Sequence, residues 1–159
     1  MTWADQITGF ISMLKDLVTP IGVGVAVYAL IYNNRQAGFR DRRKELRSVI
    51  DGIVKSIQEI ESNGLKFHTA ASYDAAVADG ILRSFTRMSA SVQRLELYKA
   101  YTPVLDAINA FKQALTLNNF DPSSFATQLH SSDIPKEIFA TAQDLIELIE
   151  QRYTDIYPL

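Results

Sequence analysis

Few side chains in this chain of 159 residues are suited to catalysis or metal binding, because it has two histidines and no cysteine. His68 and His130 fall in segments that we expect to be exposed connectors between helices. The chain has no Glu-x-x-His pair of the kind that holds two metal ions in a helical bundle. It also lacks an HExxH motif, a Walker loop, a GxGxxG loop and a nucleophile elbow. We therefore expect a protein that is not an enzyme and that uses no metal, cofactor or small-molecule substrate.

The most informative stretch is residues 17–32, LVTPIGVGVAVYALIY, in which Thr19 is the only strongly polar side chain. Uncharged residues continue through Asn34, and a helix of this length reaches about 27 Å. The hydrocarbon core of a bilayer is about 30 Å thick. Residues 1–34 are therefore predicted to contain one membrane-spanning helix. Whether residues 1–16 cross the membrane or lie on it stays open.

Three alternatives compete with a membrane-spanning helix. A cleaved signal peptide lacks support, because no positive region precedes the stretch and no small-residue cleavage site follows it. A buried helix of a soluble bundle is disfavoured by Pro20 and two glycines, which make a poor helix in water. An interfacial anchor needs one polar face, and this stretch is apolar on all sides. Gly22, Ala26 and Ala29 form a narrow face of small residues, which predicts close helix packing within the membrane.

A basic segment follows at residues 35–47. It has six Lys or Arg residues against two acidic ones, a local net charge of +4. Positive residues beside a span stay on the cytoplasmic side, which predicts an outside N-terminus and a cytoplasmic C-terminal domain. Each cation near an anionic leaflet contributes about 1 kcal/mol of membrane attraction. This predicts contact with lipid headgroups rather than nucleic acid for Arg35, Arg40, Arg42, Arg43, Lys44 and Arg47.

Residues 48–159 show helical periodicity throughout and no alternating run of strand length. Apolar residues recur at spacings of three and four, as in antiparallel helical bundles. We expect the helices to break at Asn63-Gly64, to restart after a Ser72 cap and at Thr102-Pro103, and to include a short helix at residues 123–129. The predicted fold is all-α, with a single transmembrane helix followed by a four-helix-type bundle. Its predicted core positions are Leu46, Ile50, Ile53, Ile57, Ile60, Ile81, Phe85, Met88, Val92, Leu95, Val104, Ile108, Phe111, Leu115, Ile138, Ala142, Leu145, Ile149 and Tyr153.

Two charged stripes lie on the predicted bundle helices. Arg83, Arg87 and Arg94 share one helical face, and a second stripe is formed by Asp144, Glu147 and Gln151. The stripes can pair with each other across the bundle, the arginines can receive an acidic partner, or both can be solvated surface. The arginine stripe is therefore a possible partner surface.

These features predict a membrane-anchored, non-catalytic module for protein interaction, sensing or assembly, with lipids and a protein partner or a second copy as its partners. The layout resembles that of small single-pass bacterial membrane proteins with an Arg-rich start to a cytosolic helical domain. One alternative is a membrane-acting effector or toxin whose transmembrane helix oligomerises. Another is a soluble bundle with a buried N-terminal helix.

Overall fold

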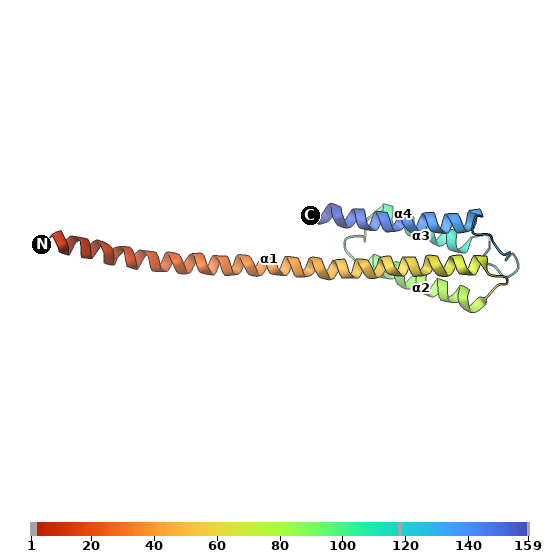
Figure 1. Ribbon diagram of the computed structural model, residues 1–159, viewed down its shortest axis with the longest axis horizontal. Coiled ribbons are helices and arrows are strands. Elements are labelled where there is room, and N and C mark those ends of the chain that lie inside the picture. Colours follow the sequence, from red (N-terminus) through yellow and green to blue (C-terminus); the bar gives the residue numbers. More distant parts are fainter. Residues whose placement is uncertain (1–2, 118, 159) are drawn as a thin grey trace. The chain divides into compact units, whose positions relative to one another are not determined.

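The described part of the chain is built from helices and their connecting segments, as the sequence predicts. The computed structural model describes residues 3–117 and 119–158, with side chains from Tyr28 onward except at Gln36. No strand occurs among these residues. The described residues form four helices (Figure 1): α1 (Trp3–Thr69), α2 (Ala75–Arg94), α3 (Thr102–Thr116) and α4 (Asp133–Ile156).

The chain divides into two compact units, Met1–Leu46 and Arg47–Leu159. The described residues of the first unit all belong to α1. In the second unit, the last part of α1 packs with α2, α3 and α4, and consecutive helices run in opposite directions (Figure 1). This second unit is the helical bundle that the sequence predicts.

Most of the core of the bundle consists of the residues with three- and four-residue spacing, to which residues such as Phe67 and Tyr98 are added. Of the nineteen predicted core positions, only Leu46 and Leu95 remain half-buried. Leu95 caps the end of α2 and has left the helical path, which explains why it departs from the pattern. Full burial of one such aliphatic side chain contributes roughly 1.5–3 kcal/mol, so these repeats supply the main driving force for folding of the bundle.

Helix α1 does not end at Asn63-Gly64, and this prediction was wrong. The helix continues to Thr69 and thereby buries Phe67 and His68. Gly64 faces α3, where an added Cβ atom would lie 2.5 Å from Cδ2 of Leu115. The glycine therefore allows two helices to approach closely, and it does not terminate α1.

Two other boundaries differ from the predictions for local reasons, and a third agrees with its prediction. The N-cap of α2 is Asp74 rather than Ser72, because its carboxylate accepts hydrogen bonds from the backbone of Ala76 and Val77. Helix α3 begins at Thr102, as predicted, with Pro103 in its first turn and no side-chain cap. Residues 123–129 form no helix: the Asp121 carboxylate accepts a bond from the Ser123 backbone N–H and closes a turn.

Candidate interaction surfaces

The first surface is the described end of the uncharged stretch at residues 17–32. Tyr28, Leu30, Ile31 and Tyr32 are between 52% and 70% exposed, and the rings of Tyr28 and Tyr32 stack with centroids 6.3 Å apart. Ala29 is exposed as well, whereas the side chains of Gly22 and Ala26 lie outside the described residues. The small-residue packing face therefore stays a prediction. Within the described part of the chain, no helix combines the length and the apolar character needed to cross a membrane.

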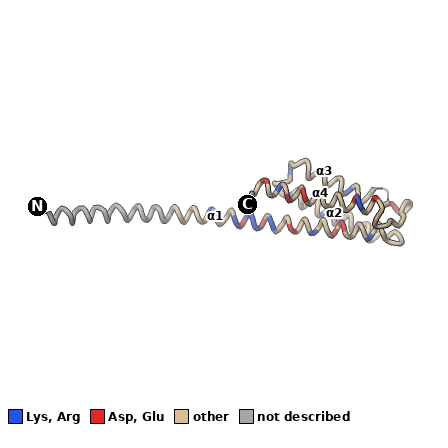
Figure 2. The backbone as a smooth tube through the Cα atoms, turned by 45° about the horizontal axis from the view of Figure 1, so that its top comes forward, with Lys and Arg blue, Asp and Glu red and all other residues tan. Residues whose placement is uncertain are grey.

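The second surface is the basic segment that follows on α1. Four of its cations, Arg35, Arg40, Arg42 and Lys44, are exposed, and Arg43 is half-buried. These cations form part of the blue bands on the α1 tube in Figure 2. Phe39 is 69% exposed among them and shares a shallow surface depression with Arg35, Gly38 and Arg42. The segment thus combines exposed positive charge with an exposed aromatic ring.

Arg47, the last predicted headgroup contact, occupies a different environment. Its guanidinium donates two hydrogen bonds to the Glu150 carboxylate, at 2.5 and 2.9 Å, and lies 2.8 Å from Asp51. It also lies 5.5 Å from the ring centroid of Tyr153. The hydrogen bond to Glu150 is the largest cause that raises the pKa of Arg47. We call these four residues the Arg47 clamp, which joins α1 to α4.

A buried tyrosine and a second arginine hold the same end of the bundle. Tyr98, in the connector between α2 and α3, is fully buried and donates its hydroxyl to the backbone oxygen of Ile149 at 3.0 Å. Burial raises the pKa of Tyr98 well above its usual value. The Arg152 guanidinium lies 4.6 Å from the Tyr101 ring centroid. The last turns of α4 are therefore tied to α1 and to the α2–α3 connector.

The opposite end of the bundle contains a buried polar network centred on His68, which is not the exposed connector residue that the sequence suggests. Nε2 of His68 lies 2.9 Å from the Leu115 backbone oxygen, and Nδ1 lies 3.1 Å from the amide nitrogen of Asn119. The Asn119 amide also bonds both backbone groups of Ala126, at 2.7 and 2.9 Å. The His68 backbone oxygen accepts from Gln128 at 2.8 Å. We call this set the His68 network.

The hydrogen-bond pattern assigns the protonation state of His68. An amide nitrogen can only donate, so Nδ1 accepts a bond and Nε2 carries the proton. Burial is the main cause that lowers the pKa of His68, and no carboxylate takes part in the network. Because both ring nitrogens are engaged, the imidazole is not available as a base or a metal ligand. Its role is to join the end of α1 to α3 and to the α3–α4 connector.

Aromatic rings surround this network. The Phe67 ring has centroid distances between 5.0 and 5.5 Å to four neighbours, which are His68, Tyr73, Phe120 and Phe125. Such contacts exclude water and strengthen the enclosed hydrogen bonds. Periodicity could not reveal this cluster, because most of its members lie in connectors. Among the described residues, no group of three or more His, Asp or Glu side chains is arranged to hold a metal ion.

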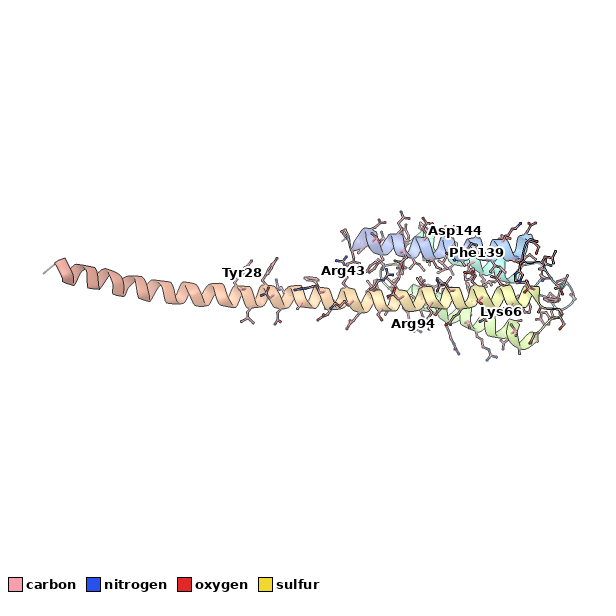
Figure 3. All side chains as sticks on the ribbon, in the orientation of Figure 1. Tyr28, Arg43, Lys66, Arg94, Phe139 and Asp144 are labelled. Carbon is pink, nitrogen blue, oxygen red and sulfur yellow. The ribbon has the colours of Figure 1, made fainter. Side chains whose placement is uncertain are left out.

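The arginine stripe lies on the outward face of α2, where Arg83, Arg87 and Arg94 are all exposed. Arg83 pairs with Asp79 one turn earlier, whereas Arg87 and Arg94 form no ion pair with other described residues. On α4, the stripe of Asp144, Glu147 and Gln151 is exposed too. Figure 3 shows Arg94 and Asp144 on opposite sides of the bundle. The alternative that the two stripes pair with each other across the bundle was therefore wrong.

A groove of about 420 Å³ runs between α1 and α2 beside the arginine stripe. Arg87 lies at this groove, together with small residues of both helices such as Gly52, Ser56, Ser84 and Ser91.

Comparison with protein families, curated proteins and solved structures finds no match to this chain.

Proposed function

We propose that this chain is a non-catalytic helical bundle tethered to a membrane through residues 17–32, where it acts as an interaction, sensing or assembly module. In this proposal its N-terminus lies outside and its bundle in the cytoplasm. One observation carries the proposal: an uncharged stretch that ends in exposed apolar side chains is followed at once by exposed cations.

The physical support is that the apolar side chains at the end of residues 17–32 favour lipid, whereas the cations of residues 35–47 favour the membrane surface. Burial of apolar surface contributes about 25 cal/mol for each Å² removed from water, and Leu30 and Ile31 leave more than half of their surfaces in water. Tyrosines such as Tyr28 and Tyr32 favour the headgroup layer, where the ring is in lipid and the hydroxyl in water. Arg35, Arg40, Arg42, Arg43 and Lys44 favour anionic headgroups. We leave Arg47 out of this set, because its guanidinium is engaged in the Arg47 clamp.

The interior of the bundle is filled by its own side chains, and this supports a role in which the outer surface binds a partner. Its core is filled by the four helices, and every described buried side-chain nitrogen or oxygen has a hydrogen-bond partner. A buried group without a partner would instead suggest an interior ligand site. The groups that remain available for recognition are the exposed charges and the exposed apolar residues on the outside of the helices.

Membrane fractionation tests the tether. We expect the full chain to stay with membranes after carbonate treatment and to dissolve only in detergent, whereas the chain from Gly38 onward is soluble. A full chain that stays in the carbonate supernatant contradicts the proposal. A soluble full chain with an insoluble Gly38-onward chain supports the alternative of a soluble bundle with a buried N-terminal helix.

Labelling tests the orientation, and the absence of native cysteine makes it simple. A membrane-impermeant maleimide added to intact cells should label the Thr2→Cys chain and not the Ser131→Cys chain. Both chains should be labelled after lysis, since Ser131 is exposed in the structure. The reverse pattern contradicts the proposed orientation without affecting the tether.

A further inference from the structure

We propose that the bundle binds a second copy of this chain, with the basic face of α2 on one copy seated against the acidic face of α4 on the other. The basic face is Arg83, Arg87 and Arg94. The acidic face is Glu137, Asp144 and Glu147, all three of which are exposed. The inference deepens the proposed interaction role by naming its partner, but it holds whether or not residues 17–32 cross a membrane.

The basic face is positioned for an intermolecular contact. The three arginines lie opposite the buried side of α2, which is formed by Ala78, Ile81, Phe85, Met88 and Val92. Only Arg83 has an ion-pair partner among the described residues, and this exposed pair with Asp79 contributes little stability. Leu82 lies beside the stripe and is 38% exposed. The face therefore offers positive charge with apolar surface at its edge.

The acidic face has the complementary properties. Glu137, Asp144 and Glu147 form no ion pair within the described part of the chain, although other exposed charges, such as Lys99 with Glu96, pair locally. The face therefore offers unpaired negative charge along one side of α4.

The spacings of the two faces match when the helices are antiparallel. At about 1.5 Å per residue, the steps from Arg83 to Arg87 and on to Arg94 are about 6 and about 10.5 Å. The steps from Glu147 to Asp144 and on to Glu137 are about 4.5 and about 10.5 Å. Three opposite-charge pairs can thus form in one register, with a mismatch of about 1.5 Å that a long arginine side chain can absorb. A parallel arrangement reverses the order of the steps and loses this match.

The two faces cannot meet within one molecule, because they lie on opposite sides of the bundle (Figure 3). A contact between different faces of two copies is heterologous, and it builds rings or open chains of molecules rather than an isolated dimer. Copies held in one membrane would be concentrated for this contact, because tethering raises the effective concentration of a partner.

Sedimentation of the full chain in mild detergent tests the inference. The wild type should self-associate, and the association should weaken between 50 and 500 mM salt because exposed charges are screened. The pair Arg87→Glu with Arg94→Glu should weaken self-association about tenfold or more, as should Asp144→Lys with Glu147→Lys. A mixture of these two variants should associate again, because each then presents the charge that the other lacks. The control pair Lys55→Glu with Lys112→Glu changes the net charge as much as the arginine reversal does, and it should associate like the wild type.

Two results overturn the inference, provided that circular dichroism shows every variant folded. A wild type that stays monomeric at all concentrations means that these faces serve a different occupant, such as another acidic protein. Association that is insensitive to both reversals but lost in the Gly22→Leu, Ala26→Leu chain means that the copies meet through residues 17–32. Neither result depends on membrane fractionation, so the tether can fail or stand independently.

Discussion

The two ends of the bundle are held together by opposite kinds of polar chemistry. The Arg47 clamp is ionic and open to water, with side-chain exposures of 41% for Arg47 and 33% for Glu150. The His68 network is neutral, and both His68 and Asn119 are buried. Each joins α1 to later parts of the chain: the clamp reaches α4, and the network reaches α3 and the α3–α4 connector.

This difference implies that the two sets of contacts differ in strength. Solvent-exposed ion pairs contribute between about 0 and 1 kcal/mol and weaken in salt. A buried polar group that loses its partner costs about 1–3 kcal/mol, because water cannot replace the bond. We therefore expect the His68 network to be insensitive to salt and the Arg47 clamp to weaken as salt rises.

The largest effect is expected for Asn119→Ala. The change removes the donor to Nδ1 of His68 and both bonds to the Ala126 backbone. We expect a loss of about 2–3 kcal/mol in the free energy of unfolding. Urea denaturation of the chain from Gly38 onward measures it, because this chain contains the complete Arg47–Leu159 unit. The matched control is Asn109→Ala on α3, where the side chain is exposed. An equal loss in the free energy of unfolding of both variants would show that the His68 network does not stabilise the bundle.

A pair of glycine substitutions is expected to act in opposite directions. Gly64→Ala places a methyl group against the buried Leu115 side chain and should destabilise the bundle by about 1–2 kcal/mol. Gly52→Ala meets no atom within 4 Å and should stabilise α1 by about 0.5–1 kcal/mol, since alanine favours a helix. Thermal unfolding of both variants gives the two signs. A stabilising Gly64→Ala would show that Leu115 moves aside freely and that the His68 end is less tightly packed than the structure indicates.

The protonation of His68 should make the bundle less stable in mild acid. Burial lowers the pKa of His68, so the unfolded chain binds a proton near pH 6.5 while the folded chain does not. Stability is then full above about pH 6.5 and falls as the pH drops from there toward the lower folded pKa, by up to about 1.4 kcal/mol between pH 7.5 and 5.5.

Urea denaturation across this pH range measures the effect of His68. The His68→Gln chain should lose this part of the slope, and the His130→Gln chain should keep it, because His130 is exposed in a connector. A pH slope that is unchanged in the His68→Gln chain assigns the acid sensitivity to other groups.

The sequence predicts one part of this molecule well and another part poorly. The core of the four helices follows from periodicity, because Ile50, Ile57, Phe111 and Ile149 repeat as helical faces must. The polar ends do not follow from it, since Arg47 and Glu150 are 103 residues apart and Arg47 looks like one more cation of the basic segment. Gly64 has the local character of a helix end, and only the position of Leu115 on another helix shows why α1 continues.

The charged outward faces of α2 and α4 could be predicted from the sequence only in part. Spacing alone places Arg83, Arg87 and Arg94 on one side of a helix, and the structure shows that side exposed. Spacing cannot show that the acidic face lies on the other side of the bundle, because this depends on how α2 and α4 are arranged around the core. The sequence therefore leaves open whether the arginine stripe and the acidic residues of α4 pair with each other or lie on separate sides of the bundle.

The smallest effect is expected at the Arg47 clamp, where a double-mutant cycle of Arg47→Met and Glu150→Gln isolates the pair. We expect a coupling energy of about 0.5–1 kcal/mol that shrinks as salt rises to 1 M. The same cycle on the more exposed Lys55 and Glu59 pair, whose charged atoms lie 4.0 Å apart, should give a value near zero. A coupling at the clamp that salt does not reduce would mean that the two hydrogen bonds are shielded from water. In that case the contrast between the Arg47 clamp and the His68 network would disappear.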